Sequence, residues 1–223
     1  MKIFALLLLF TALWCLDSLT PSLGYRPVLE QFQAEDGLSM NTVNDLATDD
    51  RGHLWIATQA GLNRFDGEHF RIYSKQDAPY GPSGNHIERL LFSSQKELWL
   101  LTLSDGLNLY HPDSGRFEIL GAEADLPLTG IRELAEDKQG MLWLLMDDAK
   151  VWRYDPKRRQ RLDSQQLQTN TVSQLRFYAT PSGDLYLAGD SLWQLDDSKS
   201  WQQMAILPQS AQVESLIQAK DGS

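Results

Sequence analysis

Short apolar runs recur along most of the chain, and turn-forming residues separate them. The first four runs cover residues 42–48, 53–58, 62–65 and 69–74, with Asp and Gly between them. Apolar runs of about four to eight residues bounded by such turn residues predict β-strands. We therefore expect four short antiparallel strands joined by tight turns.

This four-strand pattern repeats with a period of 44 residues. A tryptophan in the second run and a β-branched residue early in the first run both recur at this interval. The two columns consist of Trp55, Trp99 and Trp143, and of Val43, Ile87 and Ile131. A fourth copy has Tyr186 in the tryptophan column, and a fifth opens at Val213. Repeats of about 40–45 residues with four strands each are typical of propeller blades, so we expect an all-β fold, a β-propeller.

The repeats divide the chain into segments of similar length. Their boundaries are expected near 41–84, 85–128, 129–170 and 171–211, and the fifth begins at 212. Residues 25–223 would hold about four blades and the start of a fifth, an incomplete ring, so we expect the N-terminal part of a longer protein. The segment 28–33 is expected to add an outer strand to the missing last blade, and a frayed tail is the alternative.

The first residues have the pattern of a secretory signal. Lys2 precedes an apolar run over 3–16, and small and polar residues follow up to Gly24. The run of 14 residues is too short to cross a bilayer comfortably. We expect residues 1–24 to be removed, with an uncleaved N-terminal anchor as the alternative. Cys15, the single cysteine, would leave with the signal, and the exported chain would fold without a disulfide.

Composition and charge narrow the classes of function. Thirty acidic and 20 basic residues give a formal net charge of -10 and a pI near 4.8. Such a chain repels a phosphate backbone, so no nucleic-acid partner is expected. The four histidines and one cysteine do not stand at metal-ligand spacing, and no metal site is expected. No phosphate-binding glycine loop or nucleophile elbow occurs, and the sequence implies no cofactor.

Two kinds of residue are expected to serve the structure. The three tryptophans of the column stand in the middle of the second strand, where a large flat side chain fills the wedge between neighbouring blades. Gly52 and Gly140 close the turn between the first and second strands, where glycine takes a positive φ at little steric cost. In the same turns Asp49 and Asp137 are expected to accept hydrogen bonds from backbone amides.

Several phrases of the first repeat resemble the repeat of two-component regulator propellers. They are Asp36-Gly37-Leu38-Ser39-Met40-Asn41-Thr42-Val43, Gly52 followed by Leu54-Trp55-Ile56-Ala57-Thr58, and Gly61-Leu62-Asn63-Arg64-Phe65-Asp66-Gly67. The resemblance covers about residues 30–222 and weakens in later repeats, where Ser93, Met146 and Tyr186 depart from the pattern. It implies the periplasmic sensor region of a bacterial membrane signalling protein. In that family a further extracytoplasmic β-domain, a transmembrane helix and a histidine kinase or diguanylate cyclase follow the propeller.

A ligand is expected at the mouth of the central channel. If the first strand of each blade is innermost, its polar positions face the channel, and charges of both signs recur there. The candidates on these strands and the adjoining loops are Asn41, Asn44, Asp45, Gln59, Asn85, His86, Glu88, Arg89, Asp105, Arg132 and Glu133. Ser173 and Gln174 hold the matching positions in the fourth repeat on this alignment.

The alternative is that the channel residues are solvated or paired with one another and bind no ligand. If the channel columns do bind a ligand, replacing Arg89 and Arg132 with Ala is expected to weaken the response to the ligand and to leave thermal stability nearly unchanged, because exposed polar substitutions cost little.

Functions of different classes remain open. In the first, the propeller is a non-catalytic periplasmic sensor that binds a small molecule, for which a saccharide is one candidate. Binding would change blade or homodimer packing and so bias the remainder of the same polypeptide, anchored in the inner membrane. In the second, the chain is a secreted propeller enzyme of the lyase or glycoside-hydrolase type, which needs converging acid and base groups at the channel mouth. A non-catalytic periplasmic scaffold is the third.

Overall fold

The computed structural model describes residues 30–169, 171–180, 182–207 and 213. Contacts divide the chain into two units, Met1–Gln31 and Phe32–Ser223. The first unit is described only at its last two residues, so the expected signal over 1–24 lies outside the described residues. The fifth repeat, beginning at 212, also lies outside them apart from Val213. All the described strands belong to the second unit.

Within the described residues the second unit is a β-propeller of four blades, and the expected fold class is confirmed. Each blade is a four-stranded antiparallel sheet whose strands pair in chain order. Blade 1 contains β1 (Val43–Thr48), β2 (Leu54–Thr58), β3 (Gly61–Phe65) and β4 (Phe70–Tyr73). Blade 2 contains β5 (Ile87–Phe92), β6 (Leu98–Thr102), β7 (Leu107–His111) and β8 (Arg116–Leu120). The strands expected in the first repeat are therefore confirmed to within one residue at each end.

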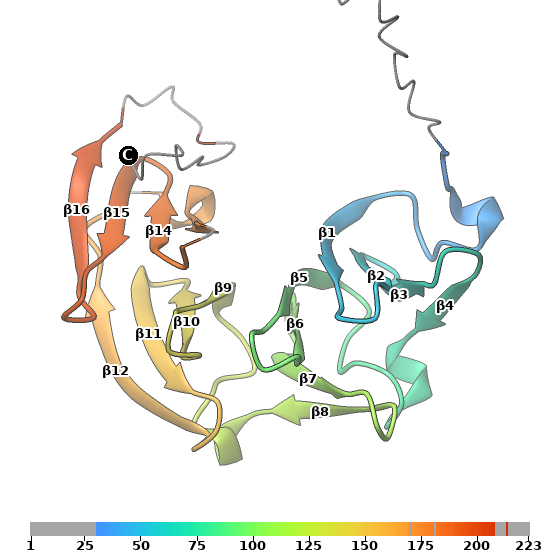
Figure 1. Cartoon of the computed structure of the whole chain (residues 1–223). Coiled ribbons are helices and arrows are strands. Elements are labelled where there is room, and N and C mark those ends of the chain that lie inside the picture. The colour runs from blue at the N-terminus through green and yellow to red at the C-terminus, as the bar shows by residue number, and fades with distance from the viewer. Residues whose placement is uncertain (1–29, 170, 181, 208–212, 214–223) are drawn as a thin grey trace, which may run out of the picture. The chain divides into compact units, whose positions relative to one another are not determined.

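The other two blades follow the same order. Blade 3 contains β9 (Ile131–Glu136), β10 (Leu142–Met146), β11 (Lys150–Asp155) and β12 (Gln160–Gln166). Blade 4 contains β13 (Arg176–Ala179), β14 (Leu185–Ala188), β15 (Ser191–Leu195) and β16 (Trp201–Ile206). A short 3-10 helix precedes the first strand of each blade: η1 (Ala34–Asp36), η2 (Lys75–Asp77), η3 (Ala122–Ala124) and η4 (Val172–Gln174). The last strand of every sheet lies on the outer side (Figure 1), and first strands of successive blades contact one another, β1 with β5, β5 with β9 and β9 with β13.

Apolar side chains fill the spaces between successive blades. Three clusters of buried residues join blade 1 to 2, 2 to 3, and 3 to 4 in the part of the chain that the structure describes. Trp55, Trp99 and Trp143 belong to these clusters and are only 2%, 1% and 1% exposed. In the turns that follow the first strands, Gly52 and Gly140 have φ of 83° and 77°, which L side chains rarely adopt.

The first strand of blade 1 is less covered than its counterpart in blade 2. Ile87 and Leu90 are 0% and 8% exposed because they pack in the cluster that joins blade 2 to blade 1. The matching Val43 and Leu46 are 43% and 54% exposed. Blade 1 covers the first strand of blade 2, but no described blade covers the first strand of blade 1 in the same way.

The described part of the segment ahead of blade 1 contacts blade 1 itself. Residues 30–33 form no strand. Instead the Phe32 ring lies 4.9 Å from the Phe65 ring and 5.5 Å from the Phe70 ring, measured between centroids. These contacts place Phe32 on blade 1 itself. Residues 28 and 29 and any closing blade lie outside the described residues, so pairing of this segment with a last blade stays a prediction.

The fourth repeat also departs from its expected alignment. Val172–Gln174 form η4, and β13 begins only at Arg176. Ten positions before the aromatic column stand Glu133 in blade 3 and Arg176 in blade 4. Arg176 therefore matches Glu133, and the assignment of Gln174 to that column is wrong by two positions, because the 3-10 turn lengthens the connection ahead of the strand.

Candidate functional site

One column of the innermost strands alternates in charge from blade to blade. Its members, ten positions before each aromatic, are Asp45, Arg89, Glu133 and Arg176. Arg89 Nε and Nη2 donate to the Glu133 carboxylate at 2.6–3.0 Å, and Arg176 Nε lies 3.2 Å from Glu133 Oε1. Asp45 Oδ2 accepts a hydrogen bond of 2.8 Å from the Leu90 amide. These contacts join β1 to β5, β5 to β9 and β9 to β13, so the column ties each blade to the next.

The two charged side chains at the centre of this column are largely buried, and burial shifts their pKa values. The side chains of Glu133 and Arg89 are 6% and 20% exposed. Burial raises the pKa of the Glu133 carboxyl, although Arg89 and Arg176 act in the opposite direction. For Arg89, burial alone would lower the pKa, and the hydrogen bonds and charge of Glu133 more than compensate, so the pKa is raised. The expectation that Arg89 is an exposed channel residue is therefore wrong, because its guanidinium is committed to Glu133.

The neighbouring column holds less buried groups. Asn44 Nδ2 donates to the Ile87 carbonyl at 2.8 Å, which adds a further link between blades 1 and 2. Glu88 Oε1 lies 2.9 Å from His86 Nε2. Arg132 forms an ion pair with Asp147, and its side chain is 45% exposed. Of the two arginines expected to be replaceable, only Arg132 is in an exposed position.

Most candidate residues on the loops form hydrogen bonds or ion pairs that stabilise the loops themselves. Asn41 and Asn85 each accept a hydrogen bond of 2.7 Å from the first amide of a 3-10 helix, η1 and η2 respectively. Asp105 pairs with Lys75 at 2.9 Å. Gln59 is exposed on the turn between β2 and β3. The eleven candidates are thus spread over three blades, and the contacts described for them either stabilise a loop or join neighbouring blades.

A pair of buried asparagines, not singled out from the sequence as functional, repeats the same design. Asn63 and Asn108 are fully buried. Asn63 accepts from the Ser39 amide and donates to its hydroxyl, both at 2.8 Å. Asn108 likewise accepts from the Ser83 amide at 2.9 Å and donates to the Ser83 hydroxyl at 2.8 Å. The signal in the sequence was that both the serine and the asparagine recur after 44 or 45 residues. In each blade the pair joins the loop ahead of the first strand to the third strand.

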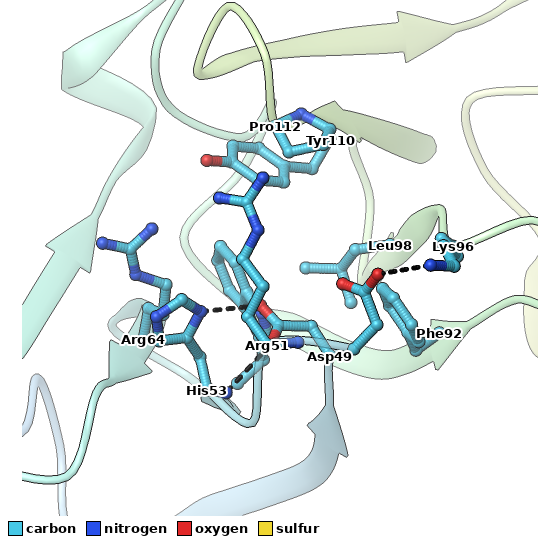
Figure 2. Close-up of a pocket in the computed structure, with 11 residues that line it drawn as sticks. Asp49, Arg51, His53, Arg64, Phe92, Lys96, Leu98, Tyr110 and Pro112 are labelled. Carbon is cyan, nitrogen blue, oxygen red and sulfur yellow. Dashed lines mark hydrogen bonds and ion pairs between the residues drawn. The ribbon is translucent and has the colours of Figure 1, made fainter.

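A cavity lies between blades 1 and 2 at the opposite end of the strands (Figure 2). Its volume is about 220 Å³. The lining consists of Asp49, Asp50, Arg51, His53, Trp55 and Arg64 from blade 1, and of Phe92, Lys96, Leu98, Tyr110 and Pro112 from blade 2. None of the eleven sequence candidates contributes to it. Because both blades supply walls, a ligand here would touch both at once.

Asp49 organises the blade 1 wall of this cavity. Its Oδ1 accepts hydrogen bonds from the amides of Arg51 and His53 at 3.0 and 2.9 Å, as expected for this turn. Its Oδ2 accepts from Trp55 Nε1 at 3.0 Å and lies 2.9 Å from His53 Nδ1. Burial alone would raise the pKa of Asp49, but the bonds from Trp55 and His53 outweigh it and lower the pKa. The carboxylate is therefore ionised and fully occupied by the protein.

Two further features bear on function. Among the described residues, no group of three or more His, Cys, Asp or Glu side chains is placed to hold a metal ion. The described part of the chain also contains no helix of the length and apolar character that a membrane crossing requires.

Comparison with known proteins points to one family for the first blade. Residues 37–60 match the two component regulator propeller family. Over 46 residues the chain is 48% identical to histidine kinase P4 of Formosa agariphila, a stretch that covers 21% of this chain and 3% of that kinase. This chain therefore corresponds to a small part of the curated relative that it matches.

Solved structures share the fold at low identity. The extracellular domain of a hybrid two component system from B. thetaiotaomicron has a TM-score of 0.58 and 17% identity, covering 81% of this chain and 32% of that one. Virginiamycin B lyase from Staphylococcus aureus has a TM-score of 0.61 and 14% identity, covering 81% and 61%. This chain thus spans less than two thirds of either structure, and identities of this size show the fold alone. The four observed blades identify the chain as a β-propeller, and its first repeat matches the two component regulator propeller family over residues 37–60.

Proposed function

We propose that this chain is the N-terminal part of the exported sensory region of a two-component signalling protein. In this role the propeller binds a small solute outside the cytoplasm and is itself non-catalytic. The observation that carries the proposal is the family match over residues 37–60, and a stretch of 46 residues that is 48% identical to a histidine kinase supports it. The charge of -10 and the signal-like residues 1–24 agree with an exported protein that does not bind nucleic acid.

The structure suggests how binding would be passed on. The alternating column centred on Glu133 and the buried clusters hold each blade against the next. A ligand that contacts two blades can favour one relative arrangement only by binding it more tightly than the other. The exposed Val43 and Leu46 offer a face on which further blades of the same polypeptide would pack. A change at the blade 1 and blade 2 boundary would then reach the rest of the protein through packed surfaces.

Export is the first part of the proposal to test. A fusion of residues 1–30 to an alkaline phosphatase that is active only outside the cytoplasm should give phosphatase activity in cells. Leu8→Arg should abolish the activity because it interrupts the apolar run, whereas the matched control Leu8→Ile should keep it. Equal activity of Leu8→Arg and the parent fusion, or no activity of either, would contradict export.

The signalling part is tested in the intact gene. The proposal expects an aromatic residue three positions after Gly222, then further blades, an apolar helix of about 20 residues and a cytoplasmic output domain. An intact gene that closes the propeller and then ends would instead support a secreted enzyme or scaffold.

A further inference from the structure

Two arginines on the wall of the cavity between blades 1 and 2 have no anionic partner among the described residues. Arg51 lies in the turn after β1, and Arg64 lies on β3. The Arg64 guanidinium carbon is 5.8 Å from the centre of the Trp55 ring, and its Nε is buried without a hydrogen bond. In Figure 2 no interaction is drawn to either guanidinium, whereas Asp49 is joined to His53, and Lys96 to an acidic side chain. Neither guanidinium is therefore paired with a carboxylate in the part of the chain that the structure describes.

The same column of blade 3 shows what a compensated arginine looks like. Arg64 stands opposite Trp55 on the next strand, and Arg153 stands opposite Trp143 in the same way. Arg153 Nε is also buried without a hydrogen bond, but Arg153 Nη2 lies 2.9 Å from Asp163, its partner on β12. In blade 1 the corresponding partner of Arg64 on β4 is Arg71, a like charge.

Like charges directly opposite each other on a sheet are destabilising. Blade 1 keeps this unfavourable arrangement where blade 3 has an ion pair. An anion bound beside Arg64 would offset part of this cost.

The acidic residues of the cavity do not neutralise the arginines. Asp49 accepts two bonds from backbone amides and one from Trp55, and it also contacts His53. Asp50 lies 2.9 Å from Lys96 Nζ across the blade boundary. The ionisable side chains Arg51, Arg64 and Lys96 exceed the two carboxylates by one positive charge, in a chain whose formal net charge is -10.

We propose that the cavity between blades 1 and 2 binds an oxyanionic group, held by Arg51 and Arg64. Guanidinium groups match the geometry of carboxylates, sulfates and phosphates with paired N–H donors. Phe92, Leu98 and Pro112 give the cavity apolar walls, where such charged hydrogen bonds are stronger than in open water. The proposal rests on this geometry and does not depend on the signalling role.

The size of the cavity limits what enters it. Its volume of about 220 Å³ corresponds to roughly seven water molecules, and sites for drug-sized ligands range from roughly 300 to 1,000 Å³. The cavity therefore accepts a small free anion or the anionic group of a larger ligand whose remainder lies outside. An acidic sugar such as a hexuronate, a sulfated sugar and a phosphate ester all satisfy this requirement.

Calorimetric titration of the purified protein tests the site with defined probes. Galacturonate is compared with galactose, which has the same ring without the carboxylate, and sodium sulfate and inorganic phosphate are titrated in parallel. We expect at least one oxyanion to bind, galactose not to bind, and binding to weaken as ionic strength rises. Which of the three anions binds most tightly shows whether the site prefers a carboxylate or a tetrahedral group.

Matched variants place the binding in the cavity. Arg64→Gln and Arg51→Gln should each weaken binding roughly ten- to a hundredfold, as expected for loss of charged hydrogen bonds. Arg158→Gln removes the same charge from an exposed turn of blade 3, where the side chain is 75% exposed, and should leave affinity within about twofold. Arg64→Gln also removes the repulsion with Arg71, so its unfolding temperature should not fall, which separates lost binding from lost folding.

Three results would overturn the proposal. They are equal affinity for galactose and galacturonate, the absence of measurable binding for all three anions, and an Arg64→Gln variant that binds as tightly as the parent.

Discussion

Arg89 and Arg132 are both expected from the sequence to be exposed, but the structure predicts different losses of stability when each is replaced by Ala. Arg89 and Arg132 both stand on innermost strands, one position apart in the repeat. Arg89 makes three hydrogen bonds to Glu133, whose side chain is 6% exposed, whereas Arg132 is 45% exposed and pairs with Asp147 at the surface. Removing one member of a buried pair typically costs about 3–5 kcal/mol because the other charge is left uncompensated.

For Arg89→Ala the structure places the cost below that range. Arg176 remains 3.2 Å from Glu133, and Arg89 itself is 20% exposed, so we expect a loss of about 2–3 kcal/mol in the free energy of unfolding. For a protein of this length such a loss lowers the unfolding temperature by about 4–12 °C. Arg132→Ala removes an exposed ion pair and should cost less than about 1 kcal/mol.

Thermal and urea unfolding, followed by circular dichroism, measure the two variants side by side. Glu133→Gln is measured as a third variant, because it removes the charge of the partner of Arg89 while keeping the size of the side chain. If Arg89→Ala and Arg132→Ala shift the unfolding transition equally, the alternating column does not hold the blades together and the reasoning is refuted.

Further predictions concern the core, the turns and acid stability. Trp99→Ala, at a side chain 1% exposed, should cost about 3–5 kcal/mol in unfolding free energy, measurable as a lower urea midpoint. Gly81→Ala should prevent folding or strongly destabilise the protein, because the new Cβ would lie 1.8 Å from the Ser74 carbonyl oxygen, while Gly115→Ala, with nothing within 4 Å, should cost only the strain of its positive φ. The pKa of Asp49 is lowered from its usual 3.8, so its contribution to stability is complete above pH 3.8 and is lost as the pH falls further. Asp49→Asn should therefore be less stable at neutral pH and lose less stability on acidification, as unfolding scans at several pH values would show.

The propeller fold could be predicted because its signal is repeated. Every blade presents an aromatic at the same place in its second strand, so an error in one repeat is corrected by the others. The fourth repeat is the exception, because Val172 imitates the start of a strand but belongs to η4. Counting from the aromatic column, which stands in the second strand of every blade, gives the correct register, whereas counting from the first apolar residue does not.

The candidate site was less predictable because pairing depends on contacts between repeats. Sequence position places Arg89 and Glu133 on innermost strands, but it does not say that the two carboxylate oxygens lie within hydrogen-bond distance of the guanidinium. The cavity at the opposite end of the strands draws on a turn, a third strand and the neighbouring blade, which no single motif brings together. One signal was present in the sequence: a hairpin through Asp66-Gly67 sets Arg64 opposite Arg71, and that uncompensated pair marks the place where we propose that an anion binds.

Ligand-dependent output of the intact signalling protein tests the proposed sensory role most directly. The measurement is expression of a gene under its control, in cells exposed to the anion that calorimetry finds to bind, with the parent, Arg64→Gln and Arg158→Gln proteins present at equal levels. We predict that the parent and Arg158→Gln respond at the same ligand concentration and that Arg64→Gln requires at least about tenfold more. Gene expression that does not change with the ligand in any of the three proteins, or that responds equally in all three, would contradict a sensory propeller whose ligand binds between blades 1 and 2.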